Sequence, residues 1–193
     1  MVKLKPHVRF LLRGSALLAG MLAFWWLALQ PPLLSLLNAC EAVVLREPVA
    51  VDDSGDWNFR VTVDDSAVTG KFNSIEFTIP RPDVVLFTFS LPVYWAIVLA
   101  AGWGKATIRA LLWGTAVVLL IEVLSLFTQV KIFAYASLAQ LHSLPGGWEV
   151  WMREFGTRMI TGVIPFAAPM LIAVGLHRGL RSQVFTPPAR FAS

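Results

Sequence analysis

The sequence has few cysteines and few charged residues, and each shortage excludes a class of protein. Cys40 is the one cysteine among 193 residues, so no disulfide can form within the chain. Charged residues make up 15% of the sequence, whereas a soluble domain usually contains about 25%. The net charge of +4 is small and unevenly placed, which does not favour nucleic-acid binding. With 56% hydrophobic residues, the composition indicates an integral membrane protein whose solvent is the lipid bilayer.

The sequence also lacks the short motifs of common catalytic and ligand-binding sites. It contains no HExxH, GxSxG, CxxC or Walker pattern. The acids between residues 52 and 65 do not have the spacing of a calcium-binding loop. We therefore expect neither a metal site nor a cofactor.

Long apolar runs predict four transmembrane helices. Residues 84–129 contain two apolar stretches separated by the basic break 102–109. Each stretch has about 20 residues, enough to cross a hydrocarbon core of about 30 Å as a helix. This pattern predicts a transmembrane helical hairpin. Residues 14–38 and 155–177 predict a first and a last transmembrane helix, and the pair Pro31-Pro32 is expected to kink the first.

The first apolar run has two alternative interpretations. A basic start followed by an apolar segment is typical of a signal peptide, and Leu37-Asn38-Ala39-Cys40 resembles a lipobox. The apolar run is longer than the 7–15 residues of a typical signal-peptide core. We therefore expect an uncleaved helix.

Residues 39–83 have the pattern of a small β-meander. Apolar residues alternate with polar ones in Trp57–Val63 and again in Ile75–Ile79, which predicts two strands. The turn residues of 64–71 separate them, and a third strand is expected at 43–51. Three strands are too few for a substantial core of their own. We expect their apolar face to rest on the membrane helices or on a partner.

The distribution of lysine and arginine predicts the orientation in the membrane. Residues 1–13, 102–109 and 178–193 contain basic residues and no acid. The positive-inside rule places such segments in the cytoplasm. We therefore expect cytoplasmic N- and C-termini, with the β-meander at 39–83 and a loop at 130–154 outside the cytoplasm. The beginning of that loop, from Ile132, is compatible with a short interfacial helix.

A few residues are candidates for function. Glu122 is the acid that lies well inside a predicted helix, so we expect it to be neutral or hydrogen-bonded within the bundle. The alternatives are a contact to another subunit and a proton relay, although no second charge inside the predicted helices is available for a relay. Cys40, His142 and Arg158 all fall near the outer end of a predicted helix. A thiol, an imidazole and a guanidinium are the groups of a cysteine nucleophile site, but ordinary structural roles are the simpler interpretation.

Two further residues are candidate partner contacts. Arg158 is spaced to pair with Glu154 at i,i+4, and the alternative is an acidic partner or a lipid headgroup. Trp57 begins the first clear strand of the meander and is a candidate contact to a partner protein.

Several runs resemble the bacterial exosortase H-associated membrane proteins. They are Phe10-Leu-Leu-Arg13, Phe24-Trp25-Trp26, the β-rich insert, 86–92 with its Pro92, and 155–169, which leads to Arg178. The resemblance implies an accessory protein beside a membrane sorting enzyme that processes exported proteins. Exosortases themselves are cysteine enzymes with more membrane spans, and this chain has no matching Cys, Arg and His motifs.

We therefore predict a four-helix protein of the bacterial inner membrane with a small external β-meander. Its expected role is that of a non-enzymatic accessory or assembly subunit that binds a larger membrane protein. Two alternatives remain: a small membrane cysteine enzyme using Cys40, and a structural subunit of a different membrane complex.

Overall fold

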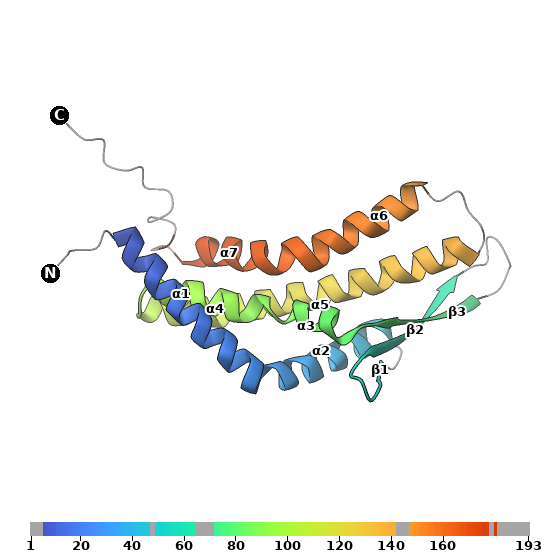
Figure 1. Cartoon of the computed structure of the whole chain (residues 1–193), viewed down its shortest axis with the longest axis horizontal. Coiled ribbons are helices and arrows are strands. Elements are labelled where there is room, and N and C mark those ends of the chain that lie inside the picture. The colour runs from blue at the N-terminus through green and yellow to red at the C-terminus, as the bar shows by residue number, and fades with distance from the viewer. Residues whose placement is uncertain (1–5, 47–48, 65–71, 142–146, 178–179, 181–193) are drawn as a thin grey trace. The chain divides into compact units, whose positions relative to one another are not determined.

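The computed structural model describes residues 6–46, 49–64, 72–141, 147–177 and 180 (Figure 1). The elements are α1 (Pro6–Phe24), the π-helical turn η1 (Trp25–Leu29), α2 (Gln30–Leu45), β1 (Ala50–Val51), β2 (Trp57–Asp64), β3 (Phe72–Ile79), α3 (Arg81–Phe87), α4 (Ser90–Ala100), α5 (Lys105–Leu141), α6 (Gly147–Arg158), the π-helical turn η2 (Met159–Val163) and α7 (Ile164–Leu176). The chain divides into two compact units. The first unit comprises 1–28, 90–119 and 166–193, and the second comprises 29–89 and 120–165.

Four helical stretches are long and apolar enough to cross a membrane. They are Phe10–Leu45, Arg81–Ala100, Lys105–Ser137 and Arg153–Leu176. The prediction of four long apolar helices with a three-stranded antiparallel sheet between the first two is confirmed. Helix α5 has 37 residues, which gives it a length of about 55 Å. It is therefore much longer than the hydrocarbon core of about 30 Å.

Helix extends beyond two of the expected boundaries, and the helix considered from Ile132 is present as part of α5. The first helical stretch continues beyond residue 38 to Leu45, so the strand expected at 43–51 is reduced to Ala50–Val51. The loop expected at 130–154 is helical over 130–141 and again from Gly147. The local strand preference of β-branched residues such as Val43 and Val44 is overridden here by burial of one helix face.

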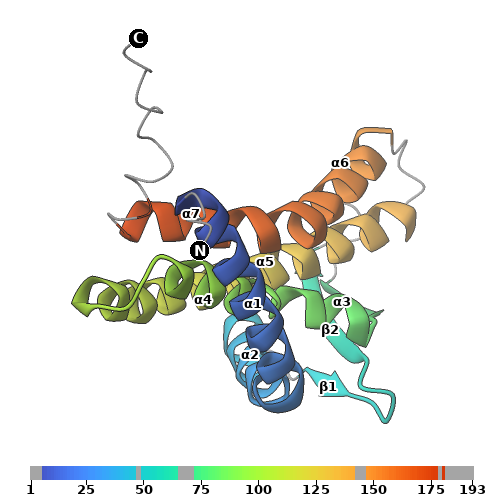
Figure 2. The same cartoon turned by 60° about the vertical axis from the view of Figure 1, so that its left-hand side comes forward.

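The first unit is a small group of packed helices. Helix α1 lies against α4 (Figure 2). Trp95 of α4 donates from Nε1 to Oγ1 of Thr115 in α5 at 2.8 Å. Tyr94 donates its hydroxyl hydrogen bond to the carbonyl oxygen of Ala110. Its ring occupies the space beside Gly114, where a Cβ atom would overlap it. Glycine at this position therefore lets α4 and α5 approach closely.

His177 lies at the end of α7, where its ring joins three parts of the first unit. The Thr107 hydroxyl donates to the carbonyl of Gly102 at 2.8 Å and lies 3.3 Å from Nε2 of His177. The backbone N–H of Leu180 donates to Nδ1 at 3.3 Å. Nδ1 therefore accepts a hydrogen bond, and Nε2 is the ring nitrogen that faces the Thr107 hydroxyl.

The second unit is built around an antiparallel sheet in the order β1-β2-β3. On one face, Trp57, Phe59 and Val61 pair with Ile79, Phe77 and Ile75. The opposite face is polar: Asn58, Arg60 and Thr62 pair with Thr78, Glu76 and Ser74. Two of these pairs interact directly. Thr78 Oγ1 donates to Asn58 Oδ1 at 2.6 Å, and Arg60 Nε donates to Glu76 Oε1 at 2.7 Å.

The apolar face of the sheet is covered by helices of the same unit. Phe59 stacks on Phe77, with ring centroids 5.7 Å apart, and Phe77 stacks on Phe133 of α5 at 5.9 Å. The buried cluster around them includes Leu126, Val130 and Ala134 of α5, Leu37 of α2, Val84 and Phe87 of α3, and Ile160 of η2. The expectation that the sheet rests on the helices is therefore confirmed.

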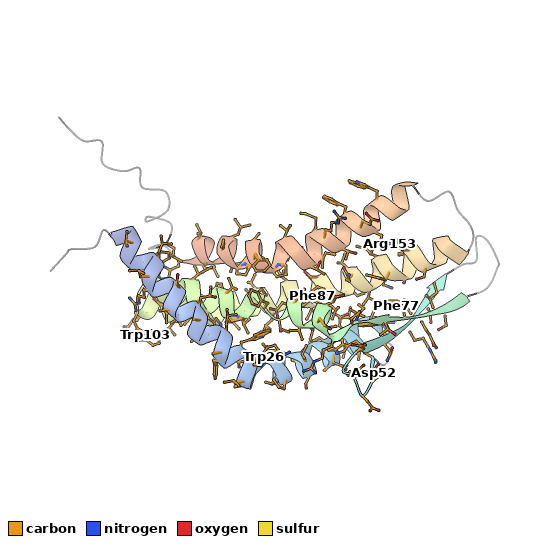
Figure 3. The ribbon with its side chains drawn as sticks, viewed as in Figure 1. Trp26, Asp52, Phe77, Phe87, Trp103 and Arg153 are labelled. Atoms are coloured by element: carbon orange, nitrogen blue, oxygen red, sulfur yellow. The ribbon has the colours of Figure 1, made fainter. Side chains whose placement is uncertain are left out.

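A hydrogen-bonded turn connects β1 to β2 (Figure 3). Oδ1 of Asp52 accepts from the Ser54 hydroxyl at 2.6 Å and from the backbone N–H groups of Ser54 and Asp56 at 3.0 and 2.9 Å. These bonds, led by that of the Ser54 side chain, lower the pKa of Asp52. The turn ends where Asp56 Oδ1 accepts from the backbone N–H of Arg81 at 2.8 Å.

Each interruption of the apolar helices lies about one turn before a proline. A proline cannot donate to the carbonyl four residues earlier. For Pro31 and Pro32 those carbonyls lie in η1, and for Pro165 the carbonyl lies in η2. For Pro92 it belongs to Thr88, in the break between α3 and α4. The predicted kink at Pro31-Pro32 is thus a π-helical turn, a common way of relieving a disturbed helix.

We predict that Gly114→Ala destabilises the protein. The added Cβ would overlap the Tyr94 ring, and overpacking of this kind costs about 1–3 kcal/mol. Thermal unfolding in detergent measures the effect. Gly175→Ala is the matched control, because no described atom lies within 4 Å of its added Cβ. Equal unfolding temperatures for the two variants would contradict the prediction.

Candidate functional site

Two of the three residues considered for cysteine catalysis lie in the described part of the chain. Cys40 lies half-buried in α2. Arg158 is at the end of α6 with 82% of its side chain exposed, and it pairs with Glu154 at 4.0 Å. His142 lies outside the described residues. The predicted Glu154–Arg158 pair is confirmed, and as an exposed pair it is worth at most about 1 kcal/mol.

The described residues contain no group of three His, Cys, Asp or Glu side chains that could hold a metal ion. They also give Cys40 no hydrogen-bonded base, although a cysteine nucleophile needs such a base or another means of becoming a thiolate.

Trp57 belongs to the buried core of the second unit. Its side chain is 2% exposed and belongs to the buried cluster beneath the sheet. Its ring lies 6.2 Å from that of Phe59, measured between centroids. A partner contact through Trp57 stays a prediction.

Glu122 lies in a buried polar row on α5. Glu122, Ser125 and Gln129 follow one another at intervals of three and four residues, so they share one side of the helix. The Glu122 side chain is 3% exposed, and it has an interaction partner in the structure. Burial is consistent with the expected contact inside the bundle, and a contact to a second subunit stays a prediction.

A second buried acid, Glu41, was not among the candidates identified from the sequence. It lies on the face of α2 that also contains Gln30, Leu34 and Leu37, and it is 0% exposed. Both of its carboxylate oxygens lack a hydrogen-bond partner among the described residues. Its position four residues after Leu37, on the same helix face, was the sequence pattern that could have indicated its burial. It was missed because the helix was expected to end at residue 38.

Two other buried polar atoms of the second unit also lack partners in the described part of the chain. They are Oε1 of Gln129 on α5 and Oγ1 of Thr157 on α6. A buried polar group without a hydrogen bond usually costs about 1–3 kcal/mol. The second unit therefore holds uncompensated polar groups on three of its helices.

The helices present large apolar surfaces to their surroundings. Exposed apolar side chains include Leu112, Trp113, Leu120 and Leu124 on α5 and Met170 and Leu171 on α7. Such surfaces are expected where lipid tails or a membrane partner replace water.

The sheet offers a polar face and an edge strand. β1 has two residues and pairs with the beginning of β2, so β3 is the other outer strand of the three. Within the described chain no strand pairs with the outer side of β3 over Phe72–Ile79. An open strand edge can bind an extended peptide through backbone hydrogen bonds.

Four long apolar helices and a small sheet define a multi-helix membrane protein with an inserted sheet. The described residues contain no group of side chains that could hold a metal ion. The family model of the exosortase H-associated membrane proteins matches residues 4–180. The chain belongs to this family, and the resemblance found in its sequence is confirmed. No curated protein and no solved structure shows a significant match.

We predict opposite outcomes when the two buried acids are replaced by leucine. Glu41→Leu removes two oxygens that lack partners, so its stability should be within about 1 kcal/mol of the natural protein or higher. Glu122→Leu removes a group that has a partner and should cost about 1–3 kcal/mol. Thermal unfolding of both variants in the same detergent checks this. A larger loss for Glu41→Leu would show that its carboxyl has a partner.

Proposed function

We propose that this protein is a non-enzymatic accessory subunit of an exosortase-type protein-sorting system in the bacterial inner membrane. The observation that carries the proposal is the family match, which covers residues 4–180 and so nearly the whole chain. Arg158 pairs with Glu154, and no base is hydrogen-bonded to Cys40 among the described residues, which favours an accessory over a catalytic role.

The proposed orientation has both termini in the cytoplasm and the sheet outside. Basic residues without acids occupy 1–13, the 102–109 connection and 178–193. Acids are concentrated in the segment that contains the sheet, including Asp52, Asp53 and Asp56. The positive-inside rule favours this orientation over its reverse.

The proposed mechanism is lateral docking to a larger membrane protein. The exposed apolar sides of α5 and α7 would pack against its helices. Arg158 would contribute a charged contact, because its guanidinium is exposed and held only by a 4.0 Å surface pair. The outer edge of β3 would bind an extended segment of the partner or of its substrate.

We predict that the sheet is accessible from outside the cytoplasm. Cys40→Ser leaves no cysteine, so a single cysteine can then be placed at will. Asp53→Cys lies in an exposed turn and Gly104→Cys in the exposed connection before α5. A membrane-impermeant maleimide should label spheroplasts carrying the first variant, and the second only after lysis. Labelling of the second but not the first in intact spheroplasts would reverse the proposed orientation.

We predict that the tagged protein co-purifies with an exosortase from membranes dissolved in mild detergent. Arg158→Glu should reduce exosortase recovery roughly tenfold, as expected for loss of a contact between charged groups. Glu154→Ala is the matched control, because it removes the internal pair and leaves Arg158 available. Quantitative mass spectrometry of the eluates gives the recoveries.

Three outcomes would contradict this account. Recovery of a different large complex without an exosortase would contradict the accessory role. Equal losses in Arg158→Glu and Glu154→Ala would assign Arg158 to internal pairing. Loss of substrate processing in a Cys40→Ser strain, with normal protein levels, would favour the cysteine enzyme instead.

A further inference from the structure

A pocket of about 450 Å³ lies within the second unit, beside α2, the β1–β2 turn and the start of α3. One wall is the face of α2 formed by Gln30, Leu34 and Asn38, which recur every four residues. Trp57 and Arg81 contribute to the rest of the lining. The volume is in the range of pockets that bind small molecules.

The pocket is lined by polar groups with unused hydrogen-bonding capacity. Gln30 is 5% exposed, and its side chain belongs to the lining. Asn38 uses one N–H to donate to the carbonyl of Val49 at 3.4 Å, which leaves its side-chain oxygen available. Ser35 donates to the carbonyl of Pro31 at 3.1 Å and keeps its capacity to accept. Amide and hydroxyl groups in a pocket lining can hydrogen-bond to a polar ligand that occupies the pocket.

The charge in the pocket is a single guanidinium. Arg81 lines it, and within the described chain no carboxylate does. The backbone N–H of Arg81 is held by Asp56, and its side chain passes over Gly55, where an added Cβ would lie 2.9 Å from its Cδ. Gly55 has a φ of 84° and lacks a side chain, so it leaves room for the arginine.

Arg81 is also the first residue of a stretch long and apolar enough to span a membrane, Arg81–Ala100. The first residue of such a helix lies near the boundary between hydrocarbon and water. Phosphate groups of lipids lie at this level, and arginine binds phosphate through paired hydrogen bonds. The apolar walls supplied by Leu34 and Trp57 suit the glycerol and upper acyl region of the same molecule.

Acids near the pocket, but outside its lining, limit the kind of headgroup. Asp52, Asp53 and Asp56 belong to the turn that contains Gly55. A ligand with net negative charge would be repelled by this turn, whereas an ammonium group next to the phosphate would be attracted. The charges therefore favour a zwitterionic headgroup.

We propose that this pocket binds the headgroup of a zwitterionic phospholipid. Arg81 holds the phosphate, the amides of Gln30 and Asn38 contact its ester oxygens, and the acidic turn attracts the ammonium group. This binding does not depend on the accessory role and persists in the purified protein.

The test is lipid binding by the full-length protein, purified in detergent and delipidated. Native mass spectrometry measures binding of phosphatidylethanolamine, phosphatidylglycerol or inorganic phosphate, each added in a titration. We expect one phosphatidylethanolamine to bind, and Arg81→Gln to weaken it roughly tenfold or more. Arg81→Gln keeps the backbone bond to Asp56. Arg60→Gln is the matched control, because Arg60 is paired with Glu76 outside this pocket.

A second variant tests the shape of the pocket without changing its charge. Ala39→Phe places an aromatic ring in the pocket lining without changing any charge. Because Ala39 is exposed, the unfolding temperature of this variant should equal that of the natural protein. It should also lose the bound lipid.

Equal lipid binding by Arg81→Gln and Arg60→Gln, or full lipid binding by Ala39→Phe, would contradict the proposal that the lipid binds in this pocket. Equal or tighter binding of phosphatidylglycerol overturns the headgroup assignment, and binding of inorganic phosphate that displaces the lipid assigns a free-phosphate site instead.

Discussion

The stack of Phe59, Phe77 and Phe133 is the contact on which the second unit depends. A sheet with two long strands is marginal in water, because it buries too little apolar surface. Here the apolar face of the hairpin is covered by α5, and each large apolar side chain buried there is worth about 1.5–3 kcal/mol. Phe133, which makes the contact from the helix side, lies in the part of α5 that continues to Leu141.

The prolines set the points at which the chain passes from one unit to the other. The boundaries at 28/29, 89/90 and 165/166 coincide with η1, the Thr88–Phe89 break and the end of η2. The N–H of Thr88 and that of Phe89 donate to carbonyls three residues earlier, at 3.1 and 3.2 Å. The fourth boundary, 119/120, lies inside α5, which contains no proline and continues unbroken. Missing backbone hydrogen bonds therefore account for three of the connections.

The functional character of the protein follows from where its polar groups lie. Cys40 is a half-buried residue of α2, and Arg158 at the end of α6 is exposed and pairs with Glu154. Among the described residues, the buried side-chain atoms without a hydrogen-bond partner belong to Glu41 on α2, Gln129 on α5 and Thr157 on α6. The chain as a whole belongs to the family of exosortase H-associated membrane proteins.

The sequence by itself determined the features that follow from local patterns. Four long apolar runs required helices, alternation in Trp57–Val63 and Ile75–Ile79 required strands, and the i,i+4 spacing required the Glu154–Arg158 pair. Local patterns do not record what an element packs against. Contacts between segments distant in sequence decided the rest. These features are the helices over 39–45 and 130–141, the burial of Trp57 and Glu41, and the pocket around Gln30 and Arg81. Burial against a neighbouring surface outweighs local preference, because each buried side chain is worth more than a residue's intrinsic propensity.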